Sequence, residues 1–343
     1  MILVLIDYLL KKVFFPSYLI PDGEVRASPR FQKLKNRIPS LQLVQACRNL
    51  FNWRMKRVFL FPLCFLFFSS LLKAERKVII IHEQGQYDCH TFRIPSIATT
   101  NKGTLLAVYD LRYRSRRDLQ GDMDIGLSRS TDGGETWSCP VAILDMEEFG
   151  GLPEDQNGCS DPNILVDRKT GAILVSALWT HGKPGTHQWK GKGSEPGHSI
   201  HKSSQFMFVR SIDDGLTWSE PVNWTQRLKE EKWHLFAPAP GNGITLSDGT
   251  LVIPTQGRDV EGVPFSNLIW SDDHGKNWTV SKPARNNTTE CAVVELRDGS
   301  LMLNMRDNRN RSDKSDTNGR AVSVTKDRGK TWSVHASGHG TMP

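Results

Sequence analysis

Ser130-Thr-Asp-Gly-Gly-Glu-Thr-Trp137 is one of four similar stretches along this chain, and their repetition decides the fold. Each stretch keeps an Asp, a Gly two residues later and a Trp five residues after the Asp. An Asp side chain bonds backbone groups further along a turn, and Gly adopts a positive φ without steric cost. We therefore predict four structural turns, each closed by the burial of a large ring. Their acidic residues are Asp132, Asp213, Asp273 and Asp327.

A hairpin pattern precedes each of these Asp turns. Two apolar runs flank a short turn that contains Gly, which is a strong short-range hairpin signal. A third run leads into the Asp turn and a fourth follows the Trp, as in 124–128 and 140–144. Four strands per repeat, with Asp-to-Asp steps of 81, 60 and 54 residues, predict an all-β fold built from unequal β-propeller blades. The four hairpins span 93–112, 161–179, 243–254 and 290–306.

Charged residues stand at the open ends of these hairpins. Pairing about the turn of the first hairpin sets Arg93 opposite Leu111. Pairing about the turn of the fourth sets Cys291 opposite Arg306, with Glu290 beside it. Because strand ends from successive blades can meet at one mouth, and because unpaired charge near a core is costly, these residues predict a functional site.

The distribution of charge argues against a nucleic-acid-binding face. The formal net charge is +7, but residues 1–54 hold nine Lys and Arg against three Asp and Glu, a net of +6. Subtracting +6 from +7 leaves +1 for the rest of the chain. No basic surface therefore remains that would suit a polyanion.

The N-terminal part of the chain consists of two different segments. Lys56-Arg57 precedes the 15-residue apolar run 58–72, which is typical of a secretory signal peptide and short for a membrane span. We expect a signal peptide over 55–74, with a retained membrane anchor as the alternative, and export to a secreted, periplasmic or lumenal location. Because a signal peptide begins at an N-terminus, we expect 1–54 to be a mis-assigned extension before a native start at Met55.

The cysteines and histidines indicate no metal centre. The four cysteines after the apolar run show no CxxC spacing, and export permits disulfides whose pairing the sequence leaves open. An insertion rich in histidine has no recognisable ligand spacing, so we predict a solvated loop there. The cysteines are Cys89, Cys139, Cys159 and Cys291, and the histidines are His181, His187, His198 and His201.

Phe92-Arg-Ile-Pro95, together with the repeated Asp turns, resembles the sialidase (neuraminidase) family, whose fold is a six-bladed β-propeller. The resemblance runs over 77–343, where about four blades are recognisable. It implies an exo-α-sialidase that hydrolyses terminal sialic acids from glycoproteins, glycolipids or oligosaccharides, without a cofactor. Contact with a membrane is expected only through an uncleaved N-terminal segment.

The resemblance also implies roles for single residues. Arg93 and Arg306 match two of three arginines that clamp the sialic acid carboxylate, a task that suits the guanidinium fork. Asp118 matches the loop acid/base, which protonates the leaving oxygen and later activates water. Glu290 matches the carboxylate that takes the proton of a tyrosine nucleophile in a retaining mechanism. Further sugar contacts are implied for Arg112 and Asp161.

Each of these assignments has a structural alternative. The arginines can pair with acidic residues at a blade end, and Glu290 can be a surface carboxylate. Asp118 lies in a charge-rich loop that can simply be solvated, and Asp122 and Asp124 compete with it for the acid/base role. Arg112 and Asp161 can be structural.

The chain departs from the family pattern after the fourth Asp turn. The family's third arginine and its tyrosine nucleophile follow that region, whereas the last tyrosine here is Tyr113 and the sequence ends at Pro343. We therefore expect a C-terminally truncated sialidase that lacks its nucleophile and is inactive or unstable alone. A catalytically silent sialoside-binding propeller is the alternative function. These patterns do not distinguish a hydrolase from a sialic acid transferase.

Overall fold

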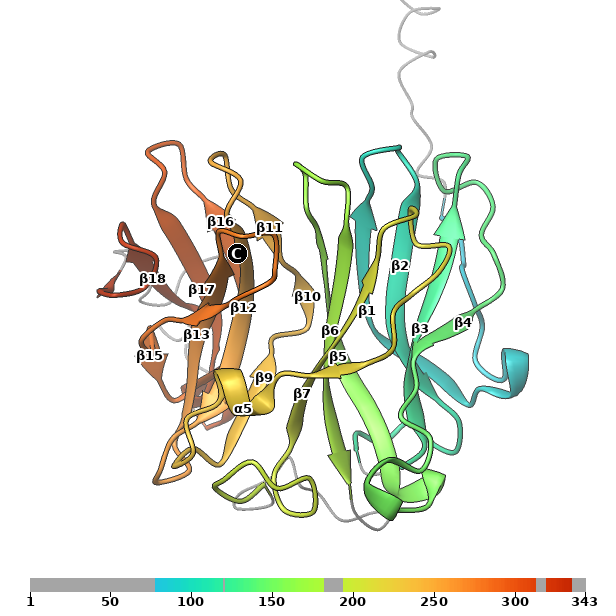
Figure 1. Cartoon of the computed structure of the whole chain (residues 1–343), viewed down its shortest axis with the longest axis horizontal. Coiled ribbons are helices and arrows are strands. Elements are labelled where there is room, and N and C mark those ends of the chain that lie inside the picture. Colours follow the sequence, from blue (N-terminus) through green and yellow to red (C-terminus); the bar gives the residue numbers. More distant parts are fainter. Residues whose placement is uncertain (1–77, 120, 182–193, 313–318, 335–343) are drawn as a thin grey trace, which may run out of the picture. The chain divides into compact units, whose positions relative to one another are not determined.

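β-strands make up nearly all of the regular structure (Figure 1). The computed structural model describes residues 78–119, 121–181, 194–312 and 319–334. In these residues the strands form three sheets, and four antiparallel units follow one another along the chain. The predicted all-β fold is therefore confirmed. The extension expected over 1–54 and the signal peptide expected over 55–74 lie outside the described residues.

The first unit contains the predicted hairpin and the two strands expected after it. Its four strands pair in chain order, and each pair is antiparallel. Short 3-10 turns lie before it at Gln86–Asp88 and after it at Phe149–Gly151 and Glu154–Gln156. The strands are β1 (Thr91–Thr99), β2 (Leu105–Arg112), β3 (Met123–Ser130) and β4 (Val141–Leu144).

The second unit repeats this order and is buried more deeply. Every residue of β5 is buried, as are all but the last of β6, because other strands cover both. One parallel pairing, Met123 with Gly158, joins this unit to the first within one sheet. Its elements are β5 (Asn157–Val166), β6 (Ile173–His181), β7 (Gln205–Ser211), β8 (Val222–Asn223) and the short helix α5 (Thr225–Leu228).

The third unit differs from the prediction at its first strand. Two separate strands, β9 (Leu235–Pro238) and β11 (Ile244–Thr245), pair with β12 (Leu251–Arg258). Between them β10 (Gly241–Asn242) pairs in parallel with β5 of the second unit. The backbone passes so close to β5 that a Cβ on Gly243 would lie 2.7 Å from Leu165. The unit ends with β13 (Pro264–Ser271), β14 (Thr279–Val280) and β15 (Arg285–Asn286).

The fourth unit returns to the simple order of four strands. Its strands again pair in sequence, and all the pairs are antiparallel. A 3-10 turn at Asn308–Arg311 follows the second strand. The strands are β16 (Thr288–Glu295), β17 (Leu301–Asp307), β18 (Ala321–Thr325) and β19 (Ser333–Val334).

The predicted register of the first hairpin was wrong by one residue near its open end. Arg93 lies opposite Asp110, not Leu111, because β1 holds one more residue than β2 between this pair and Ser96–Val108. The extra residue is a β-bulge at Ile94-Pro95, where Ile94 has a φ of 52°. Proline cannot donate to a strand ladder and restricts the residue before it, so the ladder breaks there.

The second unit has the same kind of bulge before a proline. The register of the fourth hairpin differs from the prediction for another reason. In β5 the extra residue lies at Asp161-Pro162, and Asp161 has a φ of 60°. In the fourth hairpin Cys291 lies opposite Met305, not Arg306 as predicted. The turn there is centred on Asp298, since the Leu296 amide donates to the Ser300 carbonyl at 2.8 Å. A further bulge lies between Thr288 and Cys291, and Arg306 hydrogen-bonds to Glu290 within it.

Successive units are held together by apolar clusters. One cluster joins the first and second units, one the second and third, and one the third and fourth. Full burial of an aliphatic side chain contributes about 1.5–3 kcal/mol. These shared cores therefore make each unit depend on its neighbour. Fully buried examples, one from each cluster, are Leu106, Phe236 and Leu303.

The four Asp turns form as predicted. Asp132 accepts hydrogen bonds from the Thr136 amide at 3.0 Å and from the Thr136 hydroxyl at 2.5 Å. Equivalent bonds are present at Asp213, Asp273 and Asp327. The Trp rings that close the turns are half-buried and pack against buried apolar residues, as predicted.

Each later Asp turn also contacts the hairpin of the unit before it. The residue between Asp and Gly makes this contact, and it has a positive φ in all three turns. Asp214 accepts from the Thr104 hydroxyl at 2.6 Å, and His274 Nδ1 lies 2.8 Å from Asp167 Oδ2. Arg328 likewise donates to Asp248 Oδ2 at 2.8 Å. We call these contacts the inter-unit links.

Within the described ranges, no helix has the length and apolar character needed to cross a membrane. The four cysteines considered for disulfides are free thiols, and three of them are buried. They are Cys89, Cys139, Cys159 and Cys291.

Candidate active site

The predicted site residues all lie at the open ends of hairpins. The first and second units supply four of them, and the fourth unit supplies two. The bulges in β1 and β5 place Arg93 and Asp161 where the regular ladder ends. Arg112 is the last residue of β2, Asp118 lies in the loop after it, and Glu290 and Arg306 lie on β16 and β17.

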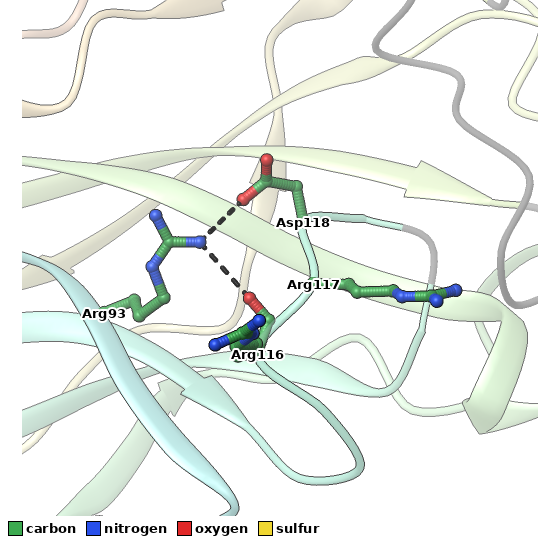
Figure 2. A pocket seen from close by; sticks show the side chains of 4 residues that line it. All are labelled: Arg93, Arg116, Arg117 and Asp118. Carbon is green, nitrogen blue, oxygen red and sulfur yellow. Dashed lines mark hydrogen bonds and ion pairs between the residues drawn. The ribbon is translucent and has the colours of Figure 1, made fainter.

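Asp118 binds two arginines at once. Its Oδ1 accepts from Arg93 Nη1 at 3.1 Å and from Arg112 Nη1 at 2.8 Å. The same two nitrogens donate to the Arg116 carbonyl, which fixes the loop against the strands. Figure 2 shows Arg93 directed at Asp118. With Arg116 and Arg117, these two residues line a pocket of about 460 Å³.

The two arginines hold the pKa of Asp118 below its usual range. Burial alone would raise this pKa, but the charges and hydrogen bonds of Arg112 and Arg93 outweigh it. Asp118 is therefore a carboxylate at neutral pH in this arrangement. Its side chain keeps 55% exposure, so a ligand in the pocket can reach it.

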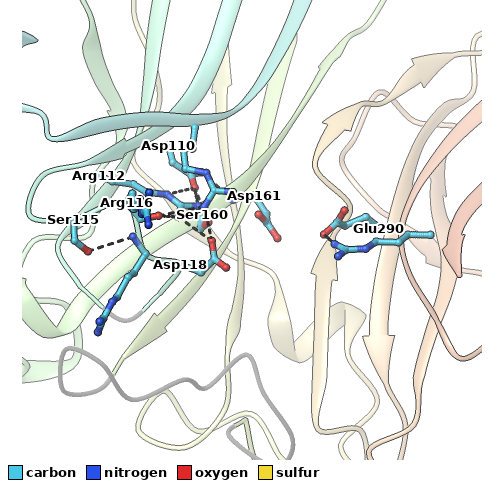
Figure 3. A network of polar contacts seen from close by, with 11 residues as sticks. Asp110, Arg112, Ser115, Arg116, Asp118, Ser160, Asp161 and Glu290 are labelled. Carbon is cyan, nitrogen blue, oxygen red and sulfur yellow. Dashed lines mark hydrogen bonds and ion pairs between the residues drawn. The ribbon is translucent and has the colours of Figure 1, made fainter. Parts of the chain in front are cut away.

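Asp110 is a buried acidic residue that the sequence interpretation missed. Its Oδ2 accepts from Arg112 Nη2 at 2.7 Å and from the Ser160 hydroxyl at 2.8 Å, while its Oδ1 accepts from the Asp161 amide at 3.1 Å. Burial raises its pKa to about 6, against the opposing effect of Arg112. Asp110 thus fixes Arg112 on the side away from Asp118, and it also fixes the bulge at Asp161 (Figure 3).

A signal for Asp110 was present in the sequence. It interrupts an otherwise apolar run in β2, and a charge in such a run requires a partner. Arg112 follows two residues later, which places both side chains on one face of the strand.

Asp161 interacts electrostatically with Asp110 of the first unit and with Glu290 of the fourth. Its side chain is buried, and its pKa lies well above the usual range because of burial and of the nearby Asp110 and Glu290 carboxylates. Figure 3 shows the Asp161 and Glu290 side chains facing one another. A protonated Asp161 can donate a hydrogen bond to a ligand hydroxyl, which a carboxylate cannot do.

Glu290 and Arg306 form the part of the site that the fourth unit supplies. Arg306 Nη1 donates to Glu290 Oε1 at 2.6 Å, and both side chains are more than a third exposed. The site therefore presents two partly exposed arginines, Arg93 and Arg306, each paired with an acidic side chain.

The two competitors for the acid/base role lie elsewhere. Asp124 is buried and accepts from the Tyr113 hydroxyl at 2.6 Å. It lines a small cavity with Asp122, Asp145 and Glu154, whereas Arg93 and Asp118 line a different one. Burial and neighbouring carboxylates raise the pKa of Asp122 to about 6 and that of Asp124 to about 8.

Across the described residues, no group of three or more His, Cys, Asp and Glu side chains is placed to hold a metal ion. His198 lies 2.9 Å from the Lys229 carbonyl, and the ring of His181 lies near that of His201. His187 lies outside the described residues.

Comparison with known proteins identifies the family. Residues 94–339 match the BNR repeat-like domain family. A sialidase of Bacteroides fragilis (strain YCH46) is 49% identical over 263 residues, which cover 77% of this chain and 47% of that protein. The chain belongs to the sialidase family.

Further comparisons agree with membership of the sialidase family. A sialidase of Paraclostridium sordellii is 29% identical over 76% of this chain and 62% of its own. The solved structure of the Hadza microbial sialidase Hz136 superposes with a TM-score of 0.72 and 45% identity, covering 76% of this chain and 49% of that one. Sialidases are β-propellers, so the strand units are propeller blades. The chain spans about half the length of the Bacteroides protein and of the Hadza structure.

The tyrosines that the structure describes in this sialidase-family chain contact residues other than Glu290. Tyr109 is buried and lies 2.7 Å from the Ser128 hydroxyl. Tyr113 donates to Asp124, and Tyr87 forms an edge contact with the His82 ring. Glu290 has its described hydrogen bond to Arg306 instead.

Proposed function

We propose that this chain is part of an exo-α-sialidase that releases terminal sialic acids from glycoproteins, glycolipids or oligosaccharides. The observation that carries the proposal is the pairing of two partly exposed arginines with two acidic side chains at the blade ends. Guanidinium groups bind a carboxylate with paired, charge-assisted hydrogen bonds. The 49% identical relative named a sialidase supports the same activity.

The proposed chemistry divides among these residues. Arg93 and Arg306 bind the sugar carboxylate, and a protonated Asp161 donates to a sugar hydroxyl, with Arg112 as a further contact. Asp118 transfers its proton to the leaving oxygen as the glycosidic bond breaks. Glu290 takes the proton of a tyrosine whose oxygen forms the new bond to the anomeric carbon. Asp118 then removes a proton from water, whose oxygen displaces the tyrosine from the anomeric carbon while Glu290 returns its proton to the tyrosine oxygen, and the product has retained configuration.

The nucleophilic tyrosine is the part of this mechanism that the described residues do not supply. For that reason a sialoside-binding propeller without turnover is the second candidate function. Both candidates need the arginines, and only the enzyme needs the tyrosine.

We further propose a six-bladed form for the whole protein, and export directed by 55–74 as a signal peptide or anchor. The basic residues followed by an apolar run support export.

Two measurements on the purified chain test the proposed function. Titration with free sialic acid measures binding, and incubation with a fluorogenic α-sialoside measures turnover. Turnover that Arg93→Gln abolishes would support the sialidase. Binding that needs Arg93 but occurs without turnover would support the silent propeller. A chain that is folded by circular dichroism and yet neither binds nor turns over would contradict both candidates.

A further inference from the structure

Asp118 does not have the proton affinity that its proposed role requires. A general acid must hold a proton at the operating pH and release it in the transition state. Two arginines instead stabilise Asp118 as a carboxylate. Some event in the reaction must therefore weaken that stabilisation before the proton transfer.

Arg93 is the partner that a ligand can remove. Its side chain is 42% exposed and contacts Asp118 through one nitrogen only. Arg112 is 1% exposed, and Asp110 holds it through two other nitrogens. A ligand carboxylate can thus reach Arg93, while Arg112 stays in place.

Resting on the proposed function, we propose that Asp118 is the resident counter-ion of Arg93, and that the carboxylate of sialic acid releases Asp118 by taking its place on the guanidinium. The released Asp118 keeps Arg112, but Arg93 is now neutralised by the ligand. The added negative charge and the shielding from water both favour the protonated form. Asp118 then takes a proton from solvent and becomes a competent acid.

In this exchange the sugar carboxylate has two roles. It binds Arg93, and by doing so it allows Asp118 to take up the proton that the reaction needs. A glycoside without a carboxylate leaves Asp118 paired and anionic, so it is processed slowly even when it is bound. Selectivity for sialosides then arises in the proton transfer as well as in binding. The charged groups around Asp118 are Arg93 from β1, Arg112 from β2 and Asp161 from β5, and Arg116 and Arg117 of its own loop line the same pocket.

A binding experiment separates this role from simple contact. The affinity of the full chain for free sialic acid is compared with that of Asp118→Asn and of Asp122→Asn at pH 7. Asp118→Asn removes the competitor for Arg93, so we expect binding to tighten by about three- to fivefold, the range of a partly exposed ion pair. Asp122→Asn removes the same charge from the same loop without freeing Arg93, and we expect unchanged affinity.

A second measurement follows the carboxyl group directly. The side-chain ¹³C signal of Asp118 is titrated against pH with and without saturating sialic acid, and its assignment is made with Asp118→Asn. We expect the pKa of Asp118 to rise on binding and also in Arg93→Gln without any ligand. The second result does not depend on sialidase activity.

The outcomes distinguish the two proposals. If the chain binds sialic acid but Asp118→Asn binds equally or more weakly, the counter-ion role is overturned and the proposed function stands. If neither form binds sialic acid, both proposals are overturned, whatever the titration of Arg93→Gln shows. Tighter binding by Asp118→Asn, with a raised pKa in the complex, supports the exchange.

Discussion

Arg306 Nη1 lies 2.6 Å from Glu290 Oε1, and this pair repeats in the fourth unit what Arg93 and Asp118 do in the first. In both places, an arginine proposed to bind the substrate is paired with an acidic residue proposed to move a proton. The substrate carboxylate must therefore compete with the protein's own carboxylates, which favours ligands that engage both arginines together.

Replacing Arg306 with Lys should weaken binding of free sialic acid by about tenfold, because a single ammonium replaces the planar fork. Calorimetric titration measures the effect. Arg309→Lys is the matched control, since Arg309 pairs with Asp307 rather than with Glu290. Equal weakening in both variants would mean that Arg306 has no special role.

Asp110→Ala should destabilise the fold strongly. The change leaves the buried Arg112 guanidinium without its principal counter-ion, a loss that typically costs about 3–5 kcal/mol. Asp118→Ala removes the exposed partner of the same arginine and should cost about 1 kcal/mol or less. Urea unfolding of the two variants measures the difference. Similar costs would show that burial does not separate the two pairs.

Asp122 and Asp124, at the start of β3, should make the folded state less stable as the pH rises. The folded pKa is about 6 for Asp122 and about 8 for Asp124, above the ordinary value of 3.8. The folded state thus binds more protons than the unfolded state between about pH 4 and pH 8, and the free energy of unfolding falls across that window. Unfolding in urea from pH 5 to 8.5 tests this.

Asp124→Asn should remove part of that pH dependence, since its amide oxygen can still accept from Tyr113. Asp272→Asn, on an exposed residue of the third unit, is the control and should leave the slope unchanged. A slope unchanged by Asp124→Asn would show that Asp124 does not carry the effect.

The inter-unit link at Asp214 should contribute about 1–2 kcal/mol to stability. Asp214→Gly keeps the positive φ of 69° without strain but loses the bonds from Thr104 and Arg129. Asp214→Asn keeps the turn and an acceptor oxygen, so it should cost less. Thermal unfolding of both variants ranks them, and a Gly variant as stable as the parent would contradict the link.

The parts of the fold that depend on local chemistry could be predicted from the sequence. The Asp turns require their own Asp, Gly and Thr side chains, and the hairpins follow from apolar runs around a Gly turn. Arg93, Glu290 and Arg306 came from the hairpin register, and their roles and Asp118 came from the family resemblance. The structure brings each arginine to an acidic partner.

The missed features have a local cause in one case and depend on contacts between distant residues in the others. The bulge at Ile94-Pro95 shifts Arg93 by one position, and simple counting from the turn ignores it. The departure of β10 toward β5 is caused by packing across two units, with no periodic pattern of its own. The lone acid in an apolar strand indicated that Asp110 has a role, but its partners Ser160 and Asp161 lie 50 and 51 residues away and no sequence pattern pointed to them.

The three inter-unit links differ in chemistry, and this restricts how the blades can be rearranged. A hydroxyl meets an acid at the first junction, and an imidazole and a guanidinium meet acids at the next two. Exchanging the second and third blades would set His274 against Thr104 and Asp214 against Asp248, which replaces an attraction with a repulsion. The residue between Asp and Gly therefore determines which blade can precede it. Recombined or designed propellers would need a complementary partner for that residue in the hairpin of the preceding blade.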